Sequence, residues 1–114
     1  MRKIYLLKSF DKYGDEIYKI GFTKQKVEKR VKQFKTGNSN PIDIIYVYQP
    51  DKYCVSIESV LHKHFESKRG DGEWFKLSDN DVKGFPKLCD DKYETFKSLE
   101  GNSWIEDNNG YNLK

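Results

Sequence analysis

The chain has 114 residues, a length typical of one domain with a modest hydrophobic core. Charged residues make up 34% of it and hydrophobic residues 36%, and no apolar run is long enough to cross a bilayer, so we expect no membrane-spanning segment. The apolar segment 4–7 is too short for the core of a secretory signal, and we therefore expect a cytoplasmic protein.

Charge is distributed unevenly along the chain. Residues 1–89 contain 18 Lys and Arg against 12 Asp and Glu, a balance of +6, whereas residues 90–114 contain 3 against 6, a balance of −3. A basic body with an acidic tail suits contact with a polyanion. On its own this indication is weak, because many soluble domains carry a similar charge.

The two cysteines, Cys54 and Cys89, predict no special chemistry. Together with His62 and His64 they make four potential zinc ligands, but their spacing fits no standard zinc module. One disulfide is possible, yet nothing in the sequence indicates an oxidising compartment. We expect free thiols in or near the core.

The first half of the chain predicts a hairpin followed by a helix. Residues 3–8 and 17–22 are short apolar and aromatic runs on either side of a polar turn, which favours two antiparallel strands. Thr23 offers an N-cap hydroxyl for a helix over 24–35. Its apolar stripe has the spacing of one helix face and consists of Val27, Val31 and Phe34.

The second half predicts one more long strand and further helices. Residues 42–49 have the apolar density of a strand covered on both faces. A helix is expected over 54–67, and a short strand or extended segment over 73–77. Ser78 is an N-cap for a helix that Gly84 and Pro86 keep short. A last helix is expected over 91–99, before a polar tail.

These elements predict an α/β fold, with a small, mainly antiparallel, three-stranded sheet flanked by helices. The expected order is β-β-α-β-α, with a possible short strand before the last helices. The expected division is a domain over residues 1–89 and an acidic C-terminal extension over residues 90–114.

Several short motifs, taken in order, resemble the GIY-YIG nuclease superfamily. They are KIYLL at 3–7, YKIGFT at 18–23, Arg30 in the next helix, and ESVLHKHFESKRGDGEWFKL at 58–77. The last segment is similar to the phage- and fungal-type branch, in which the second motif usually reads Y-K-I-G. The resemblance covers residues 3 to about 82, and it implies the superfamily's α/β fold and a phosphodiester-cleaving activity.

The two motif tyrosines of the family carry over unevenly. The first matches Tyr5, although Lys3 stands where the family has glycine. The second motif aligns as residues 19–21, so Lys19 occupies the usual tyrosine position. Tyr18 is one residue early, which in a strand places it on the opposite face.

The remaining family positions supply a metal ligand and a phosphate contact. The resemblance assigns the metal-binding carboxylate to Glu58 and the family arginine to Arg30, while Asn80 is the nearest candidate for the family's late asparagine. A carboxylate is what a hard cation prefers, which implies Mg²⁺ or Mn²⁺. Arginine can grip a phosphate with two hydrogen bonds, which lysine cannot. Without the resemblance, both side chains would be read as solvated helix residues.

Other residues are expected to assist this chemistry. Tyr5 is expected to hold or deprotonate the attacking water if its pKa is depressed, or else to be a packed aromatic residue of the core. Lys19 is expected to bind phosphate. His62 lies four residues after Glu58 and is expected to act as a general base or to orient its neighbour. Gly21 is expected to give a phosphate or the next helix room to approach.

Basic residues of the predicted helix are expected to follow the nucleic-acid backbone. They are Lys24, Lys26, Lys29, Lys32 and Lys35. In the later motif, Glu73 is expected to hold a basic residue such as Arg69, and Trp74 to be a core residue rather than a stacking surface.

The resemblance therefore implies a one-metal endonuclease that acts on nucleic acid, with double-stranded DNA as the expected partner. The missing second-motif tyrosine favours an alternative, a module with the same fold that binds nucleic acid without cutting it. A third possibility is an interaction protein of a phage or mobile element whose acidic tail, with Trp104 and Tyr111, docks onto a basic partner. A homodimer or a partner that supplies specificity is also compatible with one small domain.

Overall fold

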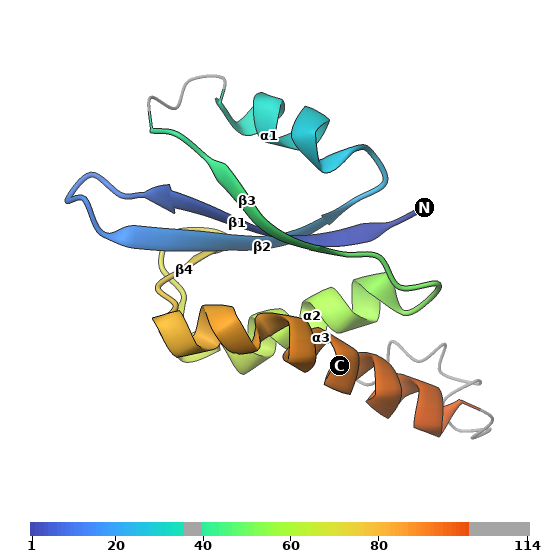
Figure 1. The fold of residues 1–114 in the computed structure, drawn as a ribbon. Coiled ribbons are helices and arrows are strands. Elements are labelled where there is room, and N and C mark those ends of the chain that lie inside the picture. Colours follow the sequence, from blue (N-terminus) through green and yellow to red (C-terminus); the bar gives the residue numbers. More distant parts are fainter. Residues whose placement is uncertain (36–39, 101–114) are drawn as a thin grey trace.

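The computed structural model describes residues 1–35 and 40–100 of the chain (Figure 1). A four-stranded antiparallel sheet in the order β3-β1-β2-β4 lies between helix α1 on one face and helices α2 and α3 on the other. The strands are β1 (Lys3–Phe10), β2 (Glu16–Thr23), β3 (Asp43–Tyr48) and β4 (Trp74–Phe75). The helices are α1 (Val27–Lys35), α2 (Cys54–His64), the single 3₁₀ turn η1 (Glu66–Lys68) and α3 (Asp79–Leu99).

The predicted α/β class with an antiparallel sheet is confirmed, and the sheet has a fourth strand. The extra strand forms because Trp74 and Phe75 pair with Lys19 and Tyr18 of β2. The segment expected to be extended over 73–77 therefore contributes two residues to the sheet.

Strand β1 is the centre of the molecule because it supplies both cores. Successive side chains of a strand point to opposite faces. Ile4 and Leu6 accordingly pack in the larger core beneath α2 and α3, whereas Tyr5 and Leu7 pack in the smaller core beneath α1. These four side chains are no more than 1% exposed.

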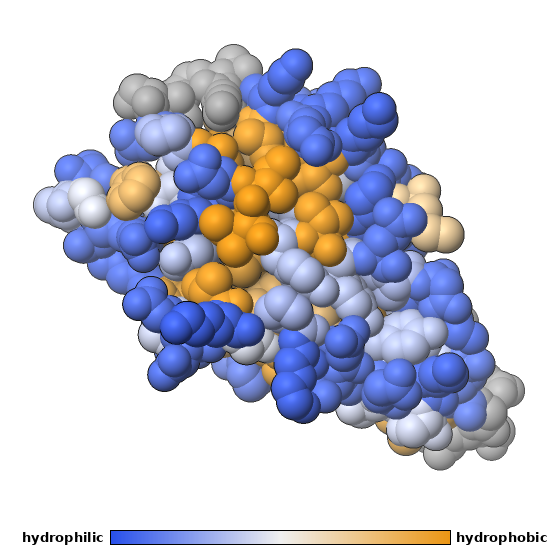
Figure 2. All heavy atoms as spheres, in the orientation of Figure 1, coloured by the Kyte–Doolittle hydropathy of each residue, from blue (hydrophilic) through white to orange (hydrophobic). Residues whose placement is uncertain are grey.

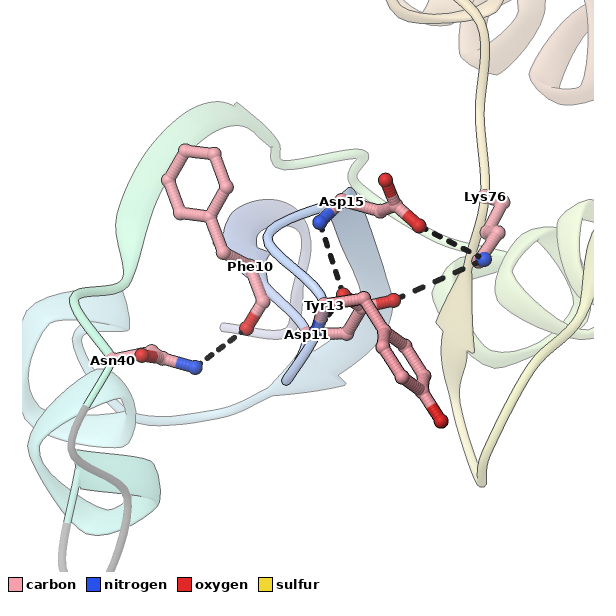
Figure 3. Close-up of polar contacts among 6 residues, drawn as sticks. All are labelled: Phe10, Asp11, Tyr13, Asp15, Asn40 and Lys76. Carbon is pink, nitrogen blue, oxygen red and sulfur yellow. Dashed lines mark hydrogen bonds and ion pairs between the residues drawn. The ribbon is translucent and has the colours of Figure 1, made fainter.

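The turn between β1 and β2 is held by one carboxylate. Asp11 accepts hydrogen bonds from the backbone N–H groups of Tyr13 and Asp15, each at 2.9 Å (Figure 3). Gly14 has a φ of 84°, in the left-handed region that glycine adopts without a steric cost. The hairpin predicted from the sequence therefore closes as expected.

Helix α1 begins three residues later than predicted, at Val27. The hydroxyl of Thr23 does not cap the helix, since it accepts a hydrogen bond from the N–H of Gln25 at 3.1 Å, in the turn ahead of it. The expected apolar stripe is confirmed: Val27 and Val31 are buried beneath the helix, and Phe34 packs against them.

The prediction that residues 42–49 are covered on both faces is wrong. Strand β3 is an edge strand, and its Ile44, Ile45 and Val47 are 37–39% exposed. Figure 2 shows apolar side chains gathered across the middle of this face, over β3. Only one face of β3 is covered: Tyr46 and Tyr48 pack on the larger core, while the neighbouring apolar side chains face solvent.

Helix α3 is one continuous helix, not the two short ones predicted around Gly84 and Pro86. Ser78 starts it with a capping box, in which its hydroxyl accepts from the N–H of Asp81 and the Asp81 carboxylate accepts from the N–H of Ser78. A proline inside a helix costs about 3 kcal/mol. Burial of three side chains from both halves offsets that cost: Phe85, Cys89 and Phe96.

The expected domain boundary after residue 89 falls inside α3. The polar tail with Trp104 and Tyr111 lies outside the described residues. No helix in the described part of the chain has the length and apolar character needed to span a membrane. The prediction of free, buried thiols is confirmed for both cysteines, and burial raises the pKa of Cys54 to about 11 and that of Cys89 to about 12.

The second half of α3 is expected to contribute to stability even though it lies beyond the predicted boundary. Phe96 stacks on Tyr53 with ring centroids 5.8 Å apart, and Tyr93 packs on the same ring at 5.7 Å. A chain that ends after residue 90 should therefore lose about 3 kcal/mol of unfolding free energy relative to one that ends after residue 100. Urea unfolding measures the difference, and equal free energies for the two chains would contradict the prediction.

Candidate active site at the edge of strand β2

The site lies at the edge of strand β2, at the point where β2 is no longer paired with β4. Strand β4 pairs only with Tyr18 and Lys19. Beyond them the carbonyl of Ile20 accepts a hydrogen bond from a side chain instead, His62 Nε2 of α2 at 2.6 Å. Because this bond brings α2 to the open strand edge, side chains from both faces of the sheet can meet there.

His62 also connects two charged neighbours. Its Nε2 lies 3.2 Å from Oε2 of Glu58, one turn earlier on α2. Its Nδ1 is 2.9 Å from a guanidinium nitrogen of Arg69, which can only donate, so Nδ1 accepts. Both ring nitrogens are therefore engaged, and the geometry suits the orienting role expected for His62 better than that of general base.

Burial and hydrogen bonding shift the pKa of His62 in opposite directions. The ring meets Phe75 edge-on at 5.1 Å, and the side chains of His62 and Glu58 are 14% and 12% exposed. Burial lowers the pKa of His62, but the hydrogen bonds to Glu58 and the Ile20 carbonyl outweigh it and raise the pKa above its ordinary value. Protonation would strengthen the contact with Glu58 and break the bond from Arg69.

The side chain of Lys19, on β2, lies next to two aromatic rings and one carboxylate. Its Nζ lies 3.2 Å from Oε1 of Glu73, and 4.9 Å and 5.5 Å from the ring centroids of Phe34 and Trp74. Glu73 was expected to hold a basic residue such as Arg69; it does pair with a basic residue, but that residue is Lys19. The loop before β4 places Glu73 beside β2, while η1 turns Arg69 back towards α2.

Two carboxylates of this cluster could hold a divalent cation. Ligand atoms of Glu58, His62 and Glu73 all lie within 4.8 Å of one another. Two oxygens bound to one Mg²⁺ lie up to about 4.2 Å apart, so a small contraction would suffice. Glu58 and Glu73 fit a hard cation with water in its remaining positions, whereas His62 has no free nitrogen to offer.

Tyr5 is buried beneath α1, with its hydroxyl directed to the same site. Its ring is tilted against Phe34 at 6.3 Å, and the residue is 1% exposed. Burial raises the pKa of Tyr5, and a hydrogen bond with Arg30 lowers it by less. The depressed pKa expected of a base is therefore not found. The phenol is protonated at neutral pH and can only hold a ligand by hydrogen bonding.

Gly21 is needed because Tyr5 lies across it. The two residues are partners in the β1–β2 register. A Cβ at position 21 would lie 2.6 Å from Cζ of Tyr5 and 2.9 Å from Cε1, closer than real Cβ atoms come to other atoms. The space that Gly21 was expected to leave for a phosphate or a helix is thus taken by the phenol.

Arg30 completes the cluster from α1. Its guanidinium stands 4.6 Å from the centroid of Phe34 and donates to Oε1 of Gln33 at 2.9 Å. A guanidinium has five N–H donors, so its hydrogen bonds to Gln33 and Tyr5 leave donors for an anion.

The lysines expected to contact nucleic acid are exposed on and just before α1. Lys24 and Lys26 precede the helix, Lys29 and Lys32 lie on it, and the side chain of Lys35 falls outside the described part of the structure. Tyr18 is 4% exposed in the larger core, on the opposite face from Lys19 as predicted.

The structure brings the main candidates together from separate parts of the sequence. The cluster contains Tyr5, Lys19, Arg30, Glu58, His62 and Glu73. Trp74 borders the cluster and is half-buried, not a full core residue, while Asn80 is exposed in the first turn of α3. The sequence did not predict the role of Arg69, because its contact with His62 depends on the path of η1.

A sequence model of the T5orf172 domain matches residues 3–90, most of the chain. The chain belongs to the T5orf172 domain family. This domain is found in phage and nuclease-like proteins. No curated protein and no solved structure shows significant similarity to the chain. All residues of the cluster lie within the matched part of this T5orf172 domain.

A methyl group at position 21 should destabilise the T5orf172 domain through its clash with the Tyr5 ring. Gly21→Ala is expected to cost about 1–3 kcal/mol, the range for overpacking a core. In a Tyr5→Leu background the added cost should nearly disappear, since the ring is no longer there. Urea unfolding of the two single variants and the double variant gives the coupling. Additive effects would show that the two positions are not in contact.

The Glu58–His62 pair should make stability depend on pH. A folded-state pKa raised above 6.5 means that this contribution is fully present below 6.5 and is lost as the pH rises through the raised pKa. Unfolding free energies at about pH 6 and about pH 8.5 should differ more in the wild type than in His62→Gln. His64→Gln, at an exposed position on the same helix, is the control and should behave as the wild type does.

Proposed function

We propose that this T5orf172 domain is a metal-dependent endonuclease of the GIY-YIG type that hydrolyses phosphodiester bonds in nucleic acid, with DNA as the expected substrate. One observation supports this above the others: two carboxylates, Glu58 and Glu73, lie beside the cations Lys19 and Arg30 at an open strand edge. The order of the motifs along the chain gives independent support.

Glu58 and Glu73 would hold Mg²⁺ or Mn²⁺. When bound, such a cation neutralises charge on a phosphate and lowers the pKa of a coordinated water. Glu58 is suited to the task because it is largely buried and His62 fixes one of its oxygens. Glu73 is 46% exposed and already paired with Lys19, so its binding to a cation would leave Lys19 without its carboxylate partner.

Three other side chains would hold the phosphate. Arg30 offers guanidinium donors at the surface of α1, and Lys19 offers a point charge that Phe34 and Trp74 keep in place. Tyr5, protonated, donates its hydroxyl and cannot take a proton from water. Positive groups fixed where negative charge develops are the usual source of transition-state stabilisation.

One observation favours the alternative, a domain that binds nucleic acid without cutting it. Lys19 occupies the tyrosine position of the second motif, and Tyr18 cannot replace that tyrosine because it is buried on the other face of the sheet. A binding domain would keep the lysines around α1 and the salt sensitivity that they confer.

Cleavage of supercoiled plasmid in the presence of Mg²⁺ or Mn²⁺ tests the proposal. Glu58→Gln and Arg30→Ala should each slow cleavage at least about a hundredfold while DNA binding persists, and EDTA should abolish it. Glu66→Gln, an exposed glutamate close by on η1, is the matched control and should cut as the wild type does.

Lys29→Ala separates binding from catalysis. This variant should weaken DNA binding and reduce the salt slope by about 1, with cleavage retained at saturating protein concentration. If the wild type cuts nothing under any metal condition while salt-sensitive binding remains, the endonuclease proposal is wrong and the binding alternative holds.

A further inference from the structure

A hollow of ≈ 480 Å³ lies beside the active site, between the β1–β2 turn and the loop that leads into β4. Its walls include two aromatic residues, Tyr13 and Trp74, together with Ile17 and the charged side chains of Asp11, Lys12, Asp71 and Lys76. This volume falls in the range of small-ligand sites, about 300–1,000 Å³, and suits one nucleobase with its sugar.

The two rings offer stacking surfaces. Tyr13 is 77% exposed at the tip of the hairpin, a high value for so large a side chain, and its one ring partner in the described structure is the Lys12 ammonium at 5.3 Å. Trp74, which also lines the hollow, is half-buried. Exposed aromatic rings beside a cationic site are what proteins use to stack unpaired bases.

The turn that carries Tyr13 is well fixed. Asp11 accepts its two backbone hydrogen bonds, and Lys76 of the strand beyond β4 lies 3.8 Å from Asp11 and 3.6 Å from Asp15 (Figure 3). These contacts place the carboxylates of the turn next to Lys76 and so bring the turn beside the β4 segment.

The lining offers a hydrogen-bond acceptor for the edge of a base. Its charged side chains are Asp11, Asp71, Lys12 and Lys76. Lys76 is paired with Asp11 and Asp15 and the Lys12 ammonium lies over the Tyr13 ring, whereas the described residues provide no ion-pair partner for Asp71. A carboxylate repels phosphate oxygens, but it accepts hydrogen bonds from the amino and imino groups at the edge of a base.

Trp74 connects the hollow to the active site. The ring that lines the hollow also lies 5.5 Å from Nζ of Lys19. A group in the hollow is therefore a close neighbour of a phosphate at Lys19 and Arg30. Resting on the proposed function, we propose that the hollow binds an unpaired nucleobase next to the scissile phosphate, so that the preferred substrate carries a single-stranded or displaced base at that point.

Tryptophan fluorescence tests this directly, because Trp104 is the one other tryptophan in the sequence. In Trp104→Phe protein, with EDTA present to prevent cleavage, a single-stranded 12-nucleotide DNA should quench Trp74 saturably. A fully paired duplex of the same sequence should quench it far less. Tyr13→Ala should weaken the single-strand affinity about tenfold or more, the effect of losing one stacking ring, and Tyr13→Phe should not.

Phe10→Ala is the matched control. Phe10 belongs to the same hairpin and is 36% exposed, but its ring points away from Tyr13 in Figure 3 and does not line the hollow. Fluorescence anisotropy of a labelled strand repeats the Tyr13 and Phe10 comparison in protein with both tryptophans, so the test does not depend on Trp104→Phe folding.

The possible outcomes separate this proposal from the nuclease itself. Single-strand binding without quenching of Trp74, or equal losses for Tyr13→Ala and Phe10→Ala, overturns the base site even if plasmid is cut. Quenching that requires Tyr13 supports the base site even if no plasmid is cut, in which case only the endonuclease proposal fails.

Discussion

The late start of β4, at Trp74, is the constraint on which the site depends. A longer β4 would pair with β2 past Lys19 and would cover the carbonyl of Ile20. Because pairing stops, that carbonyl takes its hydrogen bond from His62, and α2 is tied to the strand edge by a side chain. A buried carbonyl needs a partner, so the bond also fixes the imidazole that orients Glu58. At Ile20 the strand edge is thus capped by a side chain and is not open to sheet extension.

This arrangement lets the two faces of a thin sheet supply different parts of one site. The face beneath α1 contributes Arg30, Lys19 and the phenol of Tyr5, whereas α2 brings Glu58 and His62 from the other layer. Rings hold the cations in place: Phe34 lies under both Lys19 and Arg30. Each cation is thus positioned partly by apolar packing, and a phosphate could approach from solvent without displacing the core.

Local patterns in the sequence predict the hairpin and the apolar stripe of α1, because strand alternation and helical periodicity involve neighbouring residues. The motifs can likewise be read directly from short segments of the chain. Properties that depend on distant segments were not predictable. The apolar residues of β3 would suit a strand covered on both faces as well as they suit this edge strand. The effect of Pro86 is outweighed by burial of Phe85 and Phe96, which only the tertiary structure reveals. Likewise, the partners of Glu73 and Arg69 depend on how η1 and the following loop turn.

The contact between Tyr5 and Gly21 has an evolutionary consequence. The ring occupies the volume that any side chain at position 21 would need, so neither position is free to vary alone. A lineage that gains a side chain at 21 must first accept a smaller residue at 5, and with it the loss of the phenol beside Arg30. In this T5orf172 domain, Gly21 and Tyr5 are therefore expected to be kept together or changed together.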